Sequence, residues 1–118
     1  MASSHSDFIV KDSGQRVEFS SGMRRDTQEG KDDFLLIRKL NVIPRMARHL
    51  TLGAKKYGND NWALARTRAE QRRFKASAAR HFEQWLDGEM DEDHAAAVVF
   101  NMFAHDYVKE RIDAKRRA

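Results

Sequence analysis

The sequence of 118 residues contains no cysteine, a single proline and only six glycines. The lack of cysteine excludes disulfides, thiolate nucleophiles and cysteine-ligated zinc sites, and the scarcity of proline and glycine argues against a protein of short strands and turns. No apolar run approaches the roughly 20 residues of a membrane span, and the first residues lack the apolar core of a signal peptide. The motifs of serine-nucleophile elbows and phosphate-binding glycine loops are also missing. We therefore expect a helical protein of the cytoplasm without membrane association.

Charge is distributed unevenly along the chain. Charged residues make up 34% of the sequence, and the net charge is +4. Ten lysines and arginines lie between Arg45 and Arg80 against only two acids, and five acids then follow within seven residues. A basic segment of this kind indicates an anionic partner, either the phosphates of a nucleotide or those of a nucleic acid. Of the two, we expect the nucleotide. The acidic run predicts either a Mg²⁺ site with Glu89, Glu92 and Asp93 as ligands or simply the acidic first turn of a helix.

Residues 1–33 are predicted to form a loosely ordered N-terminal segment, because serine, aspartate, glycine and glutamine dominate it. The only strand-like stretch is Phe8–Val10, for which Val17 and Phe19 offer a pairing partner. The stretch Gly22–Lys31 is polar and bracketed by glycines, so we expect a basic loop there. Complete disorder of the segment is the alternative.

Residues 34–118 predict a single all-α, nucleotide-binding domain. Apolar residues at helical spacing indicate helices over Pro44–Tyr57, 67–86 and 91–111, the second of them ending at Gly88. Because only about four residues connect the last two helices, they are expected to pack as an antiparallel hairpin, with the first helix across it. We expect the main buried residues to be Phe74, Phe82, Trp85, Val99, Phe100 and Phe103.

The last predicted helix is apolar on two opposite faces. Phe100, Phe103 and Tyr107 share one face, whereas Val98 and Ile112 lie on the other. One small domain cannot cover both faces, because a helix that is apolar all round has to be buried all round. We therefore expect a homo-oligomer whose subunits share a core.

Polar residues occupy buried positions of the last two predicted helices. His81 lies within the apolar stripe of one helix, and His94, Asn101 and His105 line one face of the other. These side chains predict either a core satisfied by hydrogen bonds or the lining of a ligand pocket, because an unpaired buried imidazole or amide is costly. In the second case aromatic rings beside lysines would stack a base while cations hold phosphate. The predicted nucleotide-binding residues are Arg25, Lys31, Lys55, Lys56, Tyr57, Asn61, Trp62, Arg80, His81, His94 and Asn101.

Several motifs occur in a fixed order between Gly22 and Asn101. They are the stretch from Gly22 to Lys31, Met46-Ala47-Arg48-His49, Gly53-Ala54-Lys55-Lys56-Tyr57-Gly58 with Asn61-Trp62, Ala79-Arg80-His81, Trp85-Leu86-Asp87-Gly88-Glu89, and Asp91-Glu92-Asp93-His94-Ala95-Ala96 with Asn101. On these motifs the chain resembles the dATP/dGTP diphosphohydrolase-like family of phages and bacteria. The resemblance implies a MazG-like helical bundle that releases pyrophosphate from a purine (deoxy)nucleoside triphosphate with Mg²⁺, as a shared-core oligomer that manages nucleotide pools. The chain departs from such enzymes in one respect: its E-x-x-E, from Glu89 to Glu92, lies at a turn between helices rather than on facing helices.

Three functions remain open at this stage. The first is pyrophosphohydrolysis of a nucleotide. The second is binding without chemistry, for example by a phage protein that sequesters a cyclic or signalling nucleotide. This second function is favoured by arginine, lysine and histidine donors, which outnumber paired carboxylates. The third, a nucleic-acid-binding module, would require a continuous basic stripe.

Overall fold

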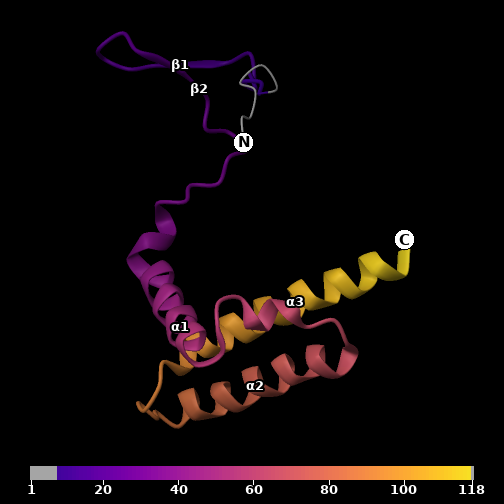
Figure 1. Cartoon of the computed structure of the whole chain (residues 1–118). Helices are drawn as coiled ribbons and strands as arrows, with labels where there is room; N and C mark the ends of the chain where they lie inside the picture. The colour runs from indigo at the N-terminus through magenta and orange to yellow at the C-terminus, as the bar shows by residue number, and fades with distance from the viewer. Residues whose placement is uncertain (1–7, 118) are drawn as a thin grey trace. The chain divides into compact units, whose positions relative to one another are not determined.

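The computed structural model describes residues 8–117 and is mostly helical. The chain has two compact units, Met1–Leu35 and Leu36–Ala118. The predicted all-α class is confirmed for the second unit, which holds all the α-helices (Figure 1).

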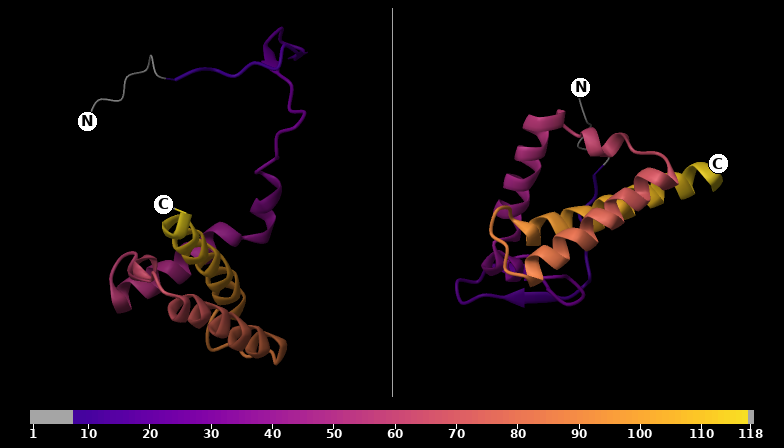
Figure 2. Two further views of the ribbon diagram at one scale, coloured as in Figure 1. Left: turned by 90° about the vertical axis from the view of Figure 1, so that its right-hand side faces the viewer. Right: turned by 90° about the horizontal axis from the view of Figure 1, so that it is seen from below.

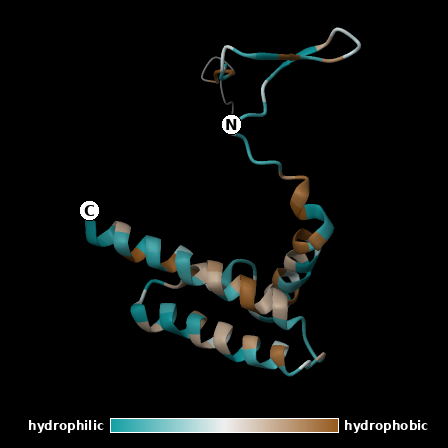
Figure 3. Cartoon of the chain, turned by 180° about the vertical axis from the view of Figure 1, so that it is seen from behind, coloured by the Kyte–Doolittle hydropathy of each residue, from teal (hydrophilic) through white to brown (hydrophobic). Residues whose placement is uncertain are grey.

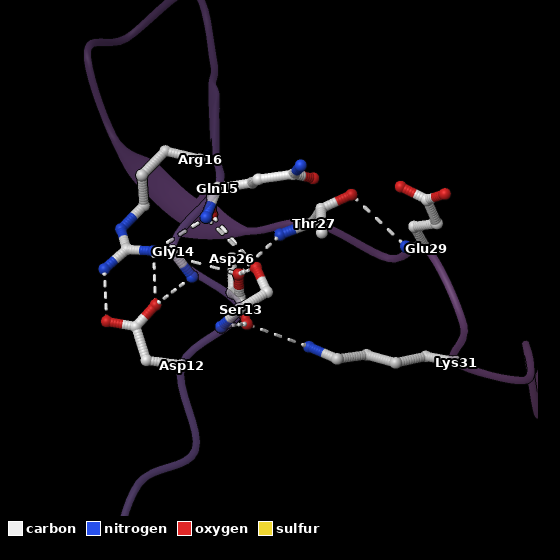
Figure 4. A network of polar contacts seen from close by, with 9 residues as sticks. All are labelled: Asp12, Ser13, Gly14, Gln15, Arg16, Asp26, Thr27, Glu29 and Lys31. Atoms are coloured by element: carbon white, nitrogen blue, oxygen red, sulfur yellow. Dashed lines mark hydrogen bonds and ion pairs between the residues drawn. The ribbon is translucent and has the colours of Figure 1, made fainter.

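The first unit contains a two-stranded antiparallel hairpin of β1 (Arg16–Glu18) and β2 (Arg24–Asp26). Asp26 organises it (Figure 4): its carboxylate accepts hydrogen bonds from the backbone N–H and hydroxyl of Ser13 and from the backbone N–H of Thr27. The ammonium of Lys31 lies 3.6 Å from the same carboxylate. Side-chain hydrogen bonds to a carboxylate therefore hold together a hairpin that has little apolar surface to bury.

The strand pairing predicted for this unit was wrong. Phe8–Val10 forms no strand, and Val17 pairs instead with Arg25, which was expected to lie in a loop. The reason is physical: the pairing depends on the polar contacts of Asp26 and not on alternating apolar residues, so the hydrophobic pattern could not reveal it.

The second unit begins with a 3₁₀ helix, η2 (Leu36–Leu40), which leads into α1 (Val42–Tyr57). Asn41 joins them in the left-handed conformation, at φ 56°. Pro44 occupies the first turn of α1, where its missing N–H breaks no helical hydrogen bond. Gly58, at φ 93°, ends the helix, and glycine is the residue that takes such a φ at least cost.

The 3₁₀ helix η3 (Asn61–Leu64) follows, and then α2 (Arg68–Leu86). A capping box fixes the start of α2. The hydroxyl of Thr67 accepts from the N–H of Glu70 at 3.1 Å, and the Glu70 carboxylate accepts from the N–H of Thr67 at 3.0 Å. The helix α2 thus begins at the residue where the sequence places a capping signal.

The last helix, α3 (His94–Arg117), packs antiparallel along α2, and α1 crosses near the turn that joins α2 to α3 (Figure 2). The helix starts where Asp93 accepts a hydrogen bond from the N–H of Ala96 at 3.0 Å. Its last turns are hydrophilic (Figure 3) and end in basic residues, which favour the negative end of the helix dipole. Among residues 8–117, no helix is both long and apolar enough to cross a membrane.

The buried residues of α2 are polar, Gln71 and His81, and those of α3 are mostly small, which departs from the predicted core. The buried apolar side chains of α3 are Ala96, Ala97, Ala104 and Val108. Of the six large residues expected in the core, Phe74, Val99 and Phe100 are half-buried.

The other three expected core residues are exposed, so their prediction was wrong. Phe82, Trp85 and Phe103 are 46%, 53% and 70% exposed. The buried stripe of α3 consists of alanines, Val108 and two polar residues, whereas Phe103 of the same helix lies outside it. The wider apolar stripes that the sequence shows therefore extend beyond the contact, onto the surface of the unit.

Candidate functional site

A cleft of about 920 Å³ opens within the helical unit. Its walls come from α1, the segment 58–62, the first half of α2, the turn between α2 and α3, and α3. A cleft of this volume falls within the range of small-ligand sites. Its composition divides into an aromatic wall, a set of cations and an acidic end.

The aromatic wall centres on Phe100 of α3. Its ring lies 5.6 Å from that of Trp62 in an edge-to-face arrangement and 6.3 Å from that of Phe74. The imidazole of His49 lies 5.2 Å from the same ring on the α1 side. Rings from four elements thus meet in one wall, which offers planar apolar surface to a flat ligand.

Four cationic side chains line the cleft, and they differ in their partners. Arg45 is fully engaged, because its guanidinium donates two hydrogen bonds to Asp93, at 2.6 and 2.8 Å. Lys56 lies over the Tyr57 ring at 5.1 Å. Within residues 8–117, Arg48 and Arg73 have neither a hydrogen-bond nor an ion-pair partner, so both guanidinium groups are free to bind an anion.

Acidic side chains and two buried histidines meet at the other end of the cleft. Asp91, Glu92 and Asp93 line the cleft at the turn before α3. The Nδ1 atoms of His81 and His94 lie 2.9 Å apart, and Nε2 of His94 lies 2.7 Å from the Asp91 carboxylate. Both imidazoles are buried, at 8% and 2% exposure.

The carboxylate fixes the tautomers of this chain of hydrogen bonds. A carboxylate only accepts, so Nε2 of His94 carries a proton, and this hydrogen bond holds the pKa of Asp91 below its usual value. In neutral His94 the lone pair then lies on Nδ1, towards His81, which donates from its own Nδ1. Burial lowers the pKa of His81, so this imidazole is neutral at pH 7.

Two further groups of the cleft have shifted acidity. Burial lowers the pKa of His49, which leaves a neutral base in the aromatic wall. The hydrogen bonds from Arg45 lower the pKa of Asp93 to about 2. Asp93 is therefore a structural link between α1 and α3 rather than a free ligand.

Two sets of side chains among the described residues bring three metal-ligating atoms within 4.8 Å of one another. One set is His81, Glu92 and His94, and the other is Glu89, Asp91 and His94. The predicted ligands Glu89 and Glu92 belong to different sets, and Asp93 belongs to neither. The carboxylates of Glu89, Asp91 and Glu92 are of the kind that Mg²⁺ prefers, whereas the histidines suit ions that accept nitrogen.

The structure brings some of the predicted nucleotide-binding residues together. Lys56, Tyr57, Asn61 and Trp62 line the cleft. His81 and His94 are adjacent beside its acidic end.

Other predicted residues lie away from the cleft lining. Lys55 and Arg80 are exposed and are not among the side chains that line the cleft. Asn101 is buried and donates to the carbonyl of Ala97 in its own helix at 2.8 Å. Arg25 and Lys31 belong to the N-terminal unit, where Lys31 pairs with Asp26.

Sequence reasoning missed the contribution of the first half of α1 and the role of Asp91. Arg45, Arg48 and His49 line the cleft, together with Arg73 of α2. One signal was available: Arg45, Arg48 and His49 stand at i, i+3 and i+4 and so share one face of a helix. The partner of that face, 48 residues away at Asp93, could not be read from local spacing.

Comparison with known proteins identifies one family. The sequence model of the family described as dATP/dGTP diphosphohydrolase, N-terminal, matches residues 21–117. No curated protein and no solved structure matches the chain.

Proposed function

The chain belongs to the dATP/dGTP diphosphohydrolase, N-terminal, family, and we propose that its helical unit binds a purine (deoxy)nucleoside triphosphate in the cleft and hydrolyses it to the monophosphate and pyrophosphate. One observation carries the proposal: the same cleft combines an aromatic wall, unpaired arginines and an acidic end. These are the groups needed to hold a base, a triphosphate and a cation, respectively. In the cell such an enzyme would adjust nucleotide pools.

The aromatic wall would hold the purine. Trp62 and Phe100 offer ring faces and edges to the base, and Tyr57 extends this surface along the cleft. Stacking of a base on an aromatic side chain contributes about 1–3 kcal/mol. Because every base has a π-face, the wall alone selects for a flat ring and leaves the choice of base to polar contacts.

The unpaired cations would hold the triphosphate. Arg48 and Arg73 have no partner among residues 8–117, and Lys56 lies along the same cleft. A guanidinium binds a phosphate through two parallel N–H bonds. Each charge-assisted hydrogen bond contributes roughly 1.5–3 kcal/mol.

The acidic end would hold a divalent cation, for which the resemblance to the family implies Mg²⁺. Asp91 and Glu92 line the cleft there and would provide the carboxylates, and Glu89 lies close to Asp91 in one of the two sets of metal-ligating side chains. When bound, such a cation neutralises phosphate charge at the reacting end of the nucleotide. His49 lies in the wall next to this end as a neutral base, and its lone pair can accept the proton of an attacking water. The new bond joins water oxygen to the α-phosphorus, the α–β bridging bond breaks, and pyrophosphate leaves.

Product analysis tests the proposal. Purified protein would be incubated with the purine and pyrimidine (deoxy)nucleoside triphosphates and Mg²⁺, and the mixtures separated by anion-exchange chromatography. We expect a purine monophosphate and pyrophosphate in equal amounts, and a loss of turnover in Trp62→Ala. If no product forms but nucleotide disappears from solution and returns on denaturation, the protein is a binding protein without chemistry. Intact and free nucleotide throughout would contradict both functions.

We also propose that the functional protein is a homo-oligomer. Within residues 8–117, Val108 is the only large apolar side chain that is fully buried. Phe82 and Trp85 stack on each other at 6.0 Å while half exposed, and Phe103 is 70% exposed. A second copy of the chain would cover this apolar surface, because large exposed patches of this kind mark protein contacts.

A further inference from the structure

Two histidines lie beside Glu92 at the acidic end of the cleft, and imidazole nitrogen is not a ligand that Mg²⁺ prefers. His81, from the middle of α2, and His94, from the first turn of α3, present their Nδ1 atoms to each other at 2.9 Å. One ring nitrogen of each histidine and one carboxylate oxygen of Glu92 lie within 4.8 Å of one another. From this arrangement we propose that His81, His94 and Glu92 form a binding site for a divalent transition metal of the zinc and cobalt type, in preference to Mg²⁺.

The distances suit an ion of this class. Zinc binds imidazole nitrogen and carboxylate oxygen at about 2.0–2.2 Å, so any two of its ligand atoms lie at most about 4 Å apart. The three candidate atoms already lie within 4.8 Å of one another. Side-chain movements of up to roughly one ångström therefore bring them into range. His81 would at the same time shift its proton from Nδ1 to Nε2, so that the Nδ1 lone pairs of both histidines can face the ion in place of the hydrogen bond that joins them.

Asp91 acts as the outer partner of one ligand. Its carboxylate accepts the Nε2 proton of His94 at 2.7 Å. This contact leaves the Nδ1 lone pair of His94 for a metal and holds the ring in place. Histidine ligands in metal sites almost always donate their second N–H to a carboxylate, carbonyl or water in this way. His94 is therefore oriented as a ligand in the structure as it stands.

A second observation next to the cluster points to a missing donor. Among residues 8–117, the only buried side-chain polar atom without a hydrogen-bond partner is Oε1 of Gln84. Gln84 lies one turn after His81 on α2, and its Nε2 donates to Glu89 at 3.4 Å. A buried carbonyl oxygen without a partner is costly. This oxygen can accept a hydrogen bond from a bound water, and the same side chain already contacts Glu89 of the second set of metal-ligating residues.

The number of protein ligands leaves one coordination position of the metal open. Two histidines and one glutamate are three protein ligands, and zinc sites with three protein ligands keep the fourth position for water or substrate. Glu92 lines the cleft, so the metal would lie at the cleft's acidic end. The site rests on these side chains alone and would exist whether or not a nucleotide is the ligand of the cleft.

Titration with metal ions tests the site. Full-length protein without a histidine tag would be stripped with chelator and titrated separately with Co²⁺, Zn²⁺ and Mg²⁺, followed by calorimetry and, for Co²⁺, by visible absorption. We expect one Co²⁺ or Zn²⁺ per chain, bound at least 100-fold more tightly than Mg²⁺, because imidazole favours these ions. Glu92→Gln removes an exposed ligand of the same size and should weaken binding at least tenfold. Asp91→Asn removes the outer carboxylate and should weaken it about 10- to 100-fold.

A matched histidine control separates the site from general histidine binding. His105→Ala removes a half-buried histidine of the same helix that belongs to neither metal-ligating set, and it should leave the affinity unchanged. Circular dichroism of each variant would confirm that the helices are retained. The proposal is overturned if the wild-type protein binds Co²⁺ and Zn²⁺ more weakly than about 1 mM, or if Glu92→Gln binds them as the wild type does. Metal binding without nucleotide turnover would leave this site standing while the proposed hydrolase activity fails.

Discussion

Replacement of Asp93 should destabilise the helical unit measurably, because this carboxylate does two things at once. It accepts two hydrogen bonds from Arg45 of α1, and it accepts the N–H of Ala96 in the first turn of α3. Loss of a helix cap costs about 1 kcal/mol. An exposed ion pair contributes a further 0.2–1 kcal/mol or so. The Asp93 side chain is 35% exposed and solvent screens the pair, so we use the lower half of that range.

The expected loss for Asp93→Ala is therefore about 1–1.5 kcal/mol of unfolding free energy. For a unit of this size, this corresponds to a fall in Tm of roughly 4–12 °C. Urea unfolding followed by circular dichroism measures it, with Glu110→Ala, which removes an exposed acid of the same helix, as the control. A loss below about 0.3 kcal/mol with an unchanged m-value would refute the reasoning.

The pH dependence of a second variant, Asp93→Asn, checks the cause. The folded pKa of Asp93 is about 2, below its ordinary value of 3.8. A depressed carboxyl pKa contributes stability that is complete above the ordinary value and is lost as the pH falls through the folded one. The difference in stability between wild type and Asp93→Asn should therefore be constant above about pH 4 and shrink between about pH 4 and pH 2. A difference that stays constant down to pH 2 would mean that charge plays no part.

Three further predictions concern the capping box, the proton acceptor and the oligomer. Thr67→Ala should cost about 1 kcal/mol in thermal or urea unfolding, because the hydroxyl caps the N–H of Glu70; an unchanged stability would show that the cap is dispensable. His49→Gln should lower kcat for nucleotide hydrolysis while nucleotide affinity is retained. In the wild type kcat should fall as the pH drops below 6.5, since burial lowers the pKa of His49 and the neutral form is the base; a flat profile would count against it. Phe103→Asp should shift the sedimentation coefficient towards that of a monomer while helicity is kept, and a wild type that is already monomeric at tens of micromolar would contradict the oligomer.

The helices could be predicted because their boundaries depend on local signals. Pro44, Gly58 and Gly88 mark helix ends through their backbone preferences, and Thr67 with Glu70 caps α2 within four residues. All of these effects act between neighbours in the sequence. A pattern of residues is therefore enough to find them.

The core and the cleft could be predicted only in part, because they depend on distances between helices. The apolar stripes of α2 and α3 are present, but alanines and Val108 form the buried apolar face of α3, and Trp85 and Phe103 lie outside the buried contact. His81 and His94 could be placed together, since a short turn joins their helices. The contact of Arg45 with Asp93 depends on how α1 crosses the hairpin, which no local pattern records. The same holds for the place of Arg48 and His49 in the cleft.

The most direct test of the central claim is calorimetric titration of a purine deoxynucleoside triphosphate into Arg73→Ala and Arg72→Ala. The two arginines are neighbours on α2 and both are exposed, but Arg73 lines the cleft and Arg72 does not. One lost charge-assisted contact of roughly 1.5–3 kcal/mol corresponds to about a 10- to 100-fold loss of affinity. We predict that loss for Arg73→Ala and wild-type affinity for Arg72→Ala, with unchanged helicity in both. Equal affinities in the two variants would contradict nucleotide binding in the cleft.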